Sequence, residues 1–264
     1  WGNQDVDIFR KAMVETEQPK THSYDIIQTL TNHEPFDFPT KEEYLKKRDG
    51  IIDAHPNLKS QKERISSYKD IFACLLYADN SIKEYMEAYS KRDDYKNTIF
   101  IITGDHRLIP IAQKDKLCRF HVPLYIFSPM LKKTATFKSI SSQWDVTPSL
   151  VSFLVNNYKF NKLEQTTWMG KGLDTTKTFR NVQSIPLTRN KGTIPDYIYK
   201  EYLYSDGELY KINENFDTER ISDDKLSRTI ITHFNEFKSL NAYLTKQNKI
   251  TPKSLNLKKL KTIN

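Results

Sequence analysis

One ten-residue stretch, residues 97–106 (Asn-Thr-Ile-Phe-Ile-Ile-Thr-Gly-Asp-His), constrains the fold more than any other part of the chain. Residues 98–103 are all β-branched or aromatic, as in a central strand that is covered on both faces. In open α/β sheets, ligands bind outside the carboxyl ends of such strands, and a glycine lets the backbone turn there. Asp105 and His106 follow at once, and a carboxylate beside an imidazole suits zinc or manganese. Taken alone, the pair more often represents a turn aspartate beside an incidental histidine.

Other segments support an α/β organisation. The apolar spacing of residues 4–17 predicts a helix, and residues 25–31 predict a strand. The loop after that strand carries His33, which we expect, like Asp105 and His106, just past a carboxyl end. Strands of a largely parallel sheet bring such loops to one edge. The three side chains are therefore predicted to converge, with the His33 imidazole within about 10 Å of the Asp105 carboxylate.

The middle of the chain predicts more helices and a second strand. Apolar residues recur at three and four positions through residues 61–92, which predicts one long amphipathic helix on the sheet. Asp79 falls on its apolar stripe, where an unpaired carboxylate is costly, so we expect Asp79 to have a partner. Residues 122–127 predict another buried strand, and residues 145–155 predict a helix with Pro148 in its first turn.

The C-terminal third has a different character. Residues 197–212 alternate around Asp206-Gly207, a sequence that is typical of a hairpin turn. Residues 223–246 predict a final helix, which a lysine-rich tail follows.

Cys74 lies among apolar positions and indicates a buried thiol; a disulfide with Cys118 is an alternative, and no zinc-binding spacing is present.

Composition and charge restrict the partners. The chain has no apolar run of about 18 residues and opens on no signal peptide, so no transmembrane helix is predicted within its 264 residues. Because its first residue is Trp1 and not Met, we expect it to be part of a longer product whose membrane anchor or export signal lies upstream. The net charge of +8 is spread among acidic residues, which favours solubility or anionic substrates over a nucleic-acid partner.

Five segments carry a family resemblance in the expected order. Residues 97–106 resemble the metal-binding strand of the alkaline phosphatase and sulfatase superfamily. Residues 29–36 (Thr-Leu-Thr-Asn-His-Glu-Pro-Phe) resemble a segment of its lipoteichoic acid synthase branch, the phosphoglycerol transferases. Residues 77–79, 121–124 and 144–150 are similar to further landmarks.

This resemblance extends from residue 1 to about residue 212 and implies a fold. The implied architecture is α/β and alkaline phosphatase-like: a mixed, largely parallel sheet with helices on both faces and a small C-terminal antiparallel β element. Residues 1–170 would be the C-terminal part of the catalytic domain, 171–250 a hairpin-and-helix subregion of it, and 251–264 a basic tail.

The resemblance also implies chemistry. The family transfers or hydrolyses phosphate or sulfate esters through a covalent intermediate, and a divalent metal neutralises charge at the transferred group. Asp105 and His106 match two ligands of one metal, most simply manganese, with zinc, calcium and magnesium as alternatives. His33 matches a catalytic and substrate-binding histidine, which would donate to a phosphate oxygen or to the leaving group.

Two further residues are candidate substrate contacts, and two expected residues are missing. Arg107 supplies a fixed cation for phosphate or sulfate oxygens, with a surface arginine as the alternative. His121 is a candidate at the edge of the site, with a hydrogen-bonded structural histidine as the alternative. The nucleophilic threonine and a glutamate ligand should precede Thr29, yet residues 1–28 do not match them.

The sequence therefore predicts a fragment of a metal-dependent phosphoglycerol or related headgroup transferase. It would act outside the cytoplasm on anionic envelope lipids or glycans, anchored to the membrane through residues absent here and completed by a missing N-terminal half. A sulfatase or phosphoethanolamine transferase of the same superfamily is one alternative. A noncatalytic relic or binding subunit is another.

Overall fold

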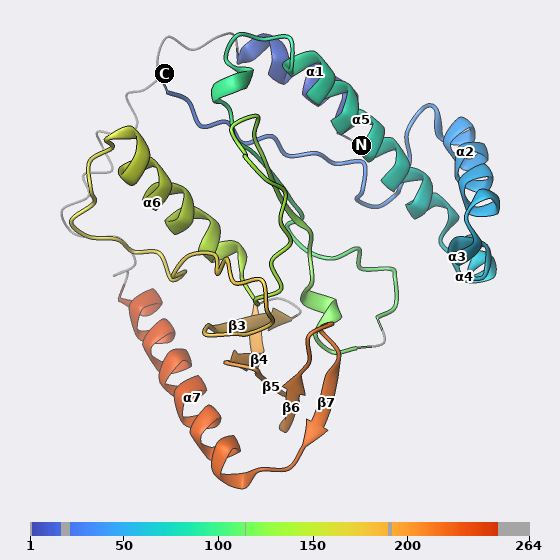
Figure 1. The fold of residues 1–264 in the computed structure, drawn as a ribbon. Helices are drawn as coiled ribbons and strands as arrows, with labels where there is room; N and C mark the ends of the chain where they lie inside the picture. Colours follow the sequence, from blue (N-terminus) through green and yellow to red (C-terminus); the bar gives the residue numbers. More distant parts are fainter. Residues whose placement is uncertain (1, 17–21, 114, 190–191, 248–264) are drawn as a thin grey trace. The chain divides into compact units, whose positions relative to one another are not determined.

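The computed structural model of this chain describes residues 2–16, 22–113, 115–189 and 192–247. The chain divides into an N-terminal unit (Trp1–Ala112 and Val122–Lys132) and a C-terminal unit (Gln113–His121 and Lys133–Asn264). Helices and strands occur in both, which confirms the predicted α/β class (Figure 1). The predicted boundary at residue 170 stays a prediction, and the basic tail lies outside the described residues.

The N-terminal unit is mostly helical. Its elements are α1 (Asp5–Glu15), α2 (Lys41–Ala54), α3 (Pro56–Lys59), α4 (Lys62–Ser66), α5 (Lys69–Tyr89), the 3-10 turn η1 (Tyr95–Asn97), β1 (Phe100–Thr103) and β2 (Leu124–Phe127). Helices α1 and α2 pack along α5 (Figure 1). The buried face of α5 contributes Ala73, Cys74 and Tyr77 to a cluster with Phe38 and Tyr44. The unit is therefore built around α5.

The long helix predicted for residues 61–92 is divided, because α4 ends at Ser66 and α5 begins at Lys69. Asp79 is exposed, and no described residue forms a hydrogen bond or ion pair with its side chain. The prediction that Asp79 has a partner is therefore wrong. Successive residues of an α-helix point about 100° apart. Because Ala78 is on the buried face of α5, Asp79 points away from that face.

The strand predicted for residues 25–31 does not form. The segment pairs with no strand among the described residues, and Ile26 is exposed. The backbone amides of Leu30 and Thr31 instead donate to the side chain of Asp5. A side-chain acceptor thus takes the place of a neighbouring strand.

The expected parallel sheet does not appear among the described strands, all of which pair antiparallel. In β1 and β2, Phe100 lies opposite Phe127 and Thr103 opposite Leu124. Parallel neighbours require a long crossover, usually a helix. The described chain between β1 and β2 forms only the short 3-10 turn η2 (Cys118–Phe120), so antiparallel pairing is the natural result.

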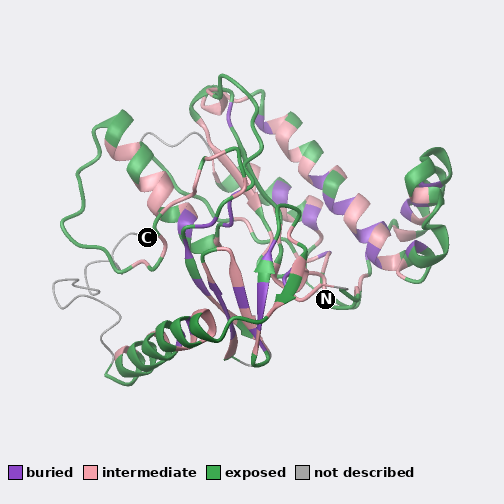
Figure 2. Ribbon diagram, turned by 60° about the horizontal axis from the view of Figure 1, so that its bottom comes forward, coloured by how far each residue is buried: buried purple, intermediate pink, exposed green. Residues whose placement is uncertain are grey.

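The C-terminal unit is an antiparallel sheet with one long helix beside it (Figure 1). Its further elements are η3 (Gln143–Asp145), α6 (Val146–Tyr158), β3 (Ser184–Arg189), β4 (Thr193–Tyr199), β5 (Tyr202–Ser205), β6 (Glu208–Ile212), β7 (Thr218–Ile221) and α7 (Asp224–Lys246). Ile230 and Phe234 of α7 cluster with Tyr197 and Leu209 of the sheet. The outward face of α7 is exposed (Figure 2).

Local sequence explains the elements that were predicted correctly here. Asp206 and Gly207 have φ angles of 52° and 84°, the left-handed conformations that a two-residue hairpin turn requires, and they join β5 to β6. The Asp223 carboxylate accepts from the Leu226 backbone amide at 2.9 Å and caps α7. The predicted helices 145–155 and 223–246 correspond to α6 and α7.

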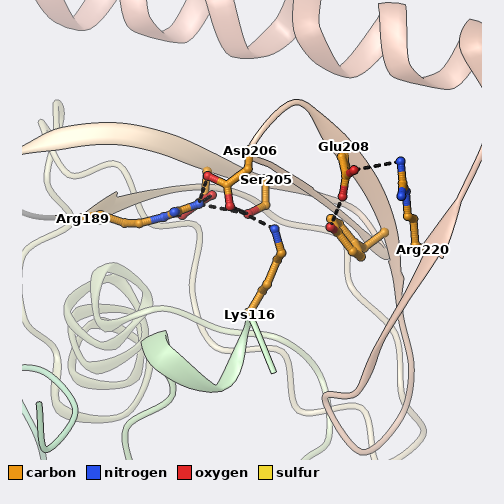
Figure 3. Close-up of polar contacts among 8 residues, drawn as sticks. Lys116, Arg189, Ser205, Asp206, Glu208 and Arg220 are labelled. Carbon is orange, nitrogen blue, oxygen red and sulfur yellow. Dashed lines mark hydrogen bonds and ion pairs between the residues drawn. The ribbon is translucent and has the colours of Figure 1, made fainter. Parts of the chain in front are cut away.

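A polar network lies at this hairpin (Figure 3). Arg189 pairs with Asp196, which is 1% exposed, and donates to Ser205 Oγ at 3.0 Å. It also lies 2.9 Å from Asp206 Oδ1, while Lys116 Nζ lies 2.9 Å from Asp206 Oδ2. The network joins the ends of β3 and β5 to the middle of β4, and it ties the residue 116 segment to the sheet.

Both cysteines are free thiols. Cys74 is buried in the α5 cluster, as predicted, and burial raises its pKa to about 12, which makes the thiol unreactive. No helix among the described residues is both long enough and apolar enough to span a bilayer.

Candidate functional site

Asp105 and His106 lie directly after β1, as the sequence predicts. Thr103 Oγ1, at the end of β1, donates to the Pro123 carbonyl at 2.8 Å and ties this end of the strand to the start of β2. Both site side chains face solvent, with 78% of the Asp105 side chain and 55% of the His106 side chain exposed. The two groups are thus open to an incoming ion or ligand.

The donor atoms of the pair fit one metal ion. His106 Nε2 lies 3.7 Å from Asp105 Oδ2. Two atoms that bind one tetrahedral ion at about 2.1 Å lie roughly 3.4 Å apart, so a small adjustment would let both bind it. The His106 backbone amide donates to Asp105 Oδ1 at 2.9 Å, which orients the carboxylate.

The histidine is also in the tautomer that a metal ligand needs. His106 Nδ1 lies 2.7 Å from the Arg107 carbonyl oxygen, which can only accept a hydrogen bond. Nδ1 must therefore carry the proton, and in the neutral ring Nε2 carries the lone pair. Metal-binding histidines are held in this way by a carbonyl or carboxylate on the far nitrogen.

Arg107 shapes the loop after this pair. Its Nη1 donates to the carbonyls of Leu108, Ile109 and Ile111, at 3.1, 2.7 and 3.1 Å. One nitrogen of the guanidinium is thus engaged in closing a tight loop. The predicted contact between Arg107 and a substrate oxygen stays a prediction.

His33 lies on a turn in the same unit. The His33 amide donates to the Leu30 carbonyl at 3.0 Å, and the Phe36 amide donates to the His33 carbonyl at 2.9 Å. The His33 ring is exposed, and Nδ1 lies 2.9 Å from the Glu34 carbonyl oxygen. By the argument used for His106, Nδ1 carries a proton and Nε2 is the nitrogen suited to acid–base work.

A groove of about 840 Å³ places His33 in a concave site. Residues 33–36 line it together with residues 66–71 at the start of α5 and with Pro110, which follows the Arg107 loop. Neighbouring parallel strands do not place His33 beside Asp105, because residues 25–31 form no strand. Of the loop that follows Asp105 and His106, Pro110 lines the groove and the pair itself does not, so the predicted convergence of His33 with Asp105 stays a prediction.

His121 belongs to the C-terminal unit. It is exposed and stacks on Phe216, with ring centroids 5.1 Å apart and planes inclined by 16°. This contact fits the alternative of a structural histidine, and its predicted role at the edge of the site stays a prediction. Nearby, Asp115 Oδ2 accepts from the Thr218 amide at 3.0 Å and from its hydroxyl at 2.7 Å.

Among the described residues, no third metal-ligating side chain joins Asp105 and His106. Within residues 2–16, 22–113, 115–189 and 192–247, no three His, Cys, Asp or Glu side chains form a group able to hold a metal. The groove wall at residues 66–71 was missed by sequence reasoning, since it lies at a break in a helix that was predicted to be continuous. The sequence signal for this break was the pair Ser66-Ser67, two polar residues inside an otherwise amphipathic pattern.

The family of this chain follows from its similarity to known proteins. The profile of the sulfatase family matches residues 1–155, more than half of the chain. The chain therefore belongs to the sulfatase family. No solved structure matches it.

Curated relatives share a longer stretch at low identity. The chain is 25% identical to lipoteichoic acid synthase 1 of Bacillus subtilis over 231 residues, which cover 81% of this chain and 33% of the relative. It is 22% identical to the lipoteichoic acid synthase of Staphylococcus saprophyticus over 227 residues, covering 81% and 31%. The lipoteichoic acid synthase-like YvgJ of Bacillus subtilis is 22% identical over 171 residues, covering 58% and 26%. The matches thus span about a third of these relatives or less.

Proposed function

We propose that this chain is the C-terminal part of a metal-dependent phosphoglycerol transferase of the sulfatase family. The supporting observation is the strand-end pair, Asp105 Oδ2 and His106 Nε2, whose 3.7 Å separation and tautomer suit a shared ion. The bound metal, most simply manganese, would neutralise charge on a phosphate. His33, in the groove, would hold or donate a proton at a phosphate oxygen or at the leaving oxygen.

The exposure of β2 supports a second part of the proposal, that further polypeptide completes the site. All four residues of β2 are apolar or aromatic and all are exposed, Tyr125 by 65%. An exposed apolar strand favours cover by more protein. We propose that this cover contains the nucleophilic threonine and the glutamate ligand that the resemblance implies.

The proposal extends to substrate and location. The relatives named lipoteichoic acid synthases support an anionic envelope phospholipid or glycan as substrate. Such a substrate would be met outside the cytoplasm at the membrane, to which an anchor in the upstream polypeptide would hold the enzyme.

One consequence concerns metal binding by the chain alone. Because Asp105 and His106 are only two ligands, residues 1–264 should show no saturable manganese or zinc binding at micromolar protein concentration in a calorimetric titration. Tight stoichiometric binding that His106→Ala abolishes would contradict this, and it would show that the chain contains a further ligand beside Asp105 and His106.

The decisive experiment uses the assembled enzyme. This chain is expressed with the polypeptide encoded upstream, and manganese-dependent release of diacylglycerol from fluorescent phosphatidylglycerol is measured. His106→Ala should lower the rate by roughly 100-fold or more, since even the outer partners of metal ligands are worth 10- to 100-fold. His55→Ala, at an exposed histidine in the same unit, should leave the rate unchanged.

The same assay separates the alternatives. Turnover of a nitrophenyl sulfate or of phosphatidylethanolamine, with no turnover of phosphatidylglycerol, would replace the proposal with a sulfatase or a phosphoethanolamine transferase. If the protein binds phosphatidylglycerol vesicles without turnover, and His106→Ala does not change that binding, the result would support a noncatalytic binding subunit.

A further inference from the structure

A buried carboxylate lies behind the turn that carries His33. Asp5, the first residue of α1, is 1% exposed. Its Oδ1 accepts from the Leu30 amide at 3.0 Å, from the Thr31 amide at 2.9 Å and from the Thr31 hydroxyl at 2.8 Å. Within the described residues, Oδ2 has no hydrogen-bond partner. All polar contacts of this carboxylate are therefore made to two residues.

Those two residues begin the His33 turn. The Leu30 carbonyl accepts from the His33 amide at 3.0 Å, so residues 30–33 form one tight turn. Asp5 holds the amide groups at the start of this turn, and His33 lies at its end. No strand of the described chain lies beside residues 25–31, and the Asp5 carboxylate is the acceptor that holds the end of this segment.

The first turn of α1 is itself fixed to α5. Tyr77, 4% exposed on α5, donates from its hydroxyl to Gln4 Oε1 at 3.1 Å. The Leu30 side chain lies against Gly2, where an added Cβ would approach Leu30 Cδ1 to 2.7 Å. The start of α1 is thus held between the central helix of the unit and the His33 turn.

We propose that Asp5 is a positioning residue that sets the place of His33 in the groove. Nothing in the sequence marked Asp5 for this role, because it lies 28 positions before His33 and looks like an ordinary helix N-terminal acid. The role of His33 rests on the proposed function above; the mechanical link between Asp5 and His33 does not.

The link is tested on the chain alone by NMR of the His33 imidazole and by amide hydrogen exchange. Asp5→Ala removes the acceptor of three hydrogen bonds, so the His33 ring signals should shift or broaden, and exchange across residues 30–36 should rise at least about tenfold. Exchange in α5 should stay within about twofold. Asp5→Asn retains an Oδ1 acceptor and should restore the wild-type His33 signals.

A matched control is Asp7→Ala, which removes an exposed acid from the same turn of α1 and should leave His33 unaffected. Unchanged His33 signals and exchange in Asp5→Ala would overturn the proposal. A uniform rise in exchange through α5 as well would also overturn it, because Asp5 would then stabilise the whole unit rather than position one turn.

The assembled enzyme gives a second readout. If Asp5 acts through His33, Asp5→Ala should lower kcat more than it raises KM, and it should add little to the defect of His33→Ala in the double variant. Fully additive defects would contradict the proposal. An assembled enzyme without any activity would refute the proposed function, whereas the NMR result would still decide the positional link.

Discussion

Replacing Gly170 with alanine is expected to unfold the C-terminal unit. A Cβ at this position would lie 1.9 Å from the Trp144 carbonyl oxygen, 2.3 Å from its carbonyl carbon and 2.8 Å from the Asp145 amide nitrogen. All three atoms belong to the backbone, which cannot move aside as a side chain can. Relief would require the chain to separate at the start of α6, at an expected cost of about 4 kcal/mol or more.

The same rearrangement would break the bonds of a buried carboxylate. Asp145 is 1% exposed; its Oδ1 accepts from the Lys171 and Gly172 amides at 2.9 and 3.2 Å, and its Oδ2 accepts from the Ser142 amide at 2.8 Å. The Asp145 carboxylate thus closes a capping box with Ser142 at the start of η3, and it also holds the segment at residues 171–172. Separation of residues 144 and 170 would remove the Lys171 and Gly172 amide donors from the buried Oδ1 of that carboxylate.

Near-UV circular dichroism and thermal unfolding measure the outcome. Gly50→Ala is the matched control, because it lies inside α2, nothing lies within 4 Å of its added Cβ, and it should stabilise by about 0.5–1 kcal/mol. A Gly170→Ala protein with native spectra and a free energy of unfolding within about 1 kcal/mol of wild type would contradict the prediction that position 170 admits only glycine.

The second large effect is expected at Arg189. Arg189→Ala leaves the Asp196 carboxylate buried without its partner, and removal of one member of a buried pair costs about 3–5 kcal/mol. Chemical denaturation of the C-terminal unit measures the loss. Arg220→Ala is the control, because Arg220 is 70% exposed where it meets Glu208, and such a pair contributes about 0–1 kcal/mol.

A double variant separates charge burial from packing. Arg189→Leu combined with Asp196→Leu removes both charges and should recover much of the lost stability. If the double variant is as unstable as Arg189→Ala, the defect comes from lost packing and the ion-pair interpretation fails.

The pH dependence of the network follows from Asp206. Lys116 first, and then Arg189, hold its pKa below the usual range. Its contribution to stability is therefore present at neutral pH, and it is lost as the pH falls through that lowered pKa. Because Asp206 is half exposed, the effect should be small beside that of Arg189.

Local sequence signals predicted the elements that depend on local physics. The hairpin at Asp206-Gly207 needs two left-handed residues, and only a few residue types tolerate that conformation. The position of the strand before Asp105, with Asp105 and His106 just past its end, also follows from a short apolar run that a glycine terminates. These features need no knowledge of distant partners. The predicted cover of β1 and β2 is wrong: β1 pairs only with β2 among the described strands, and β2, predicted to be buried, is exposed.

Features that depend on distant partners were not predictable from such signals. The apolar pattern of residues 25–31 suits a strand, but a strand also requires a neighbour, and the available acceptor is the side chain of Asp5. The break at residues 67–68 and the exposure of Asp79 depend in the same way on how α5 rotates against α1 and α2. The apolar periodicity predicts the helix, but it does not predict which residues of α5 face α1 and α2.

Because residues 113–121 belong to the C-terminal unit, the two units alternate along the sequence. The backbone passes from one to the other after residues 112, 121 and 132, so neither is a single continuous segment. A polypeptide that starts at Lys133 would lack Leu117, which fills the apolar cluster around Ile185 and Leu203. A protease cut after Lys132 would leave the C-terminal part bound to Asp115 and Lys116. The C-terminal unit therefore cannot be moved or replaced as a cassette without the stretch that joins β1 to β2.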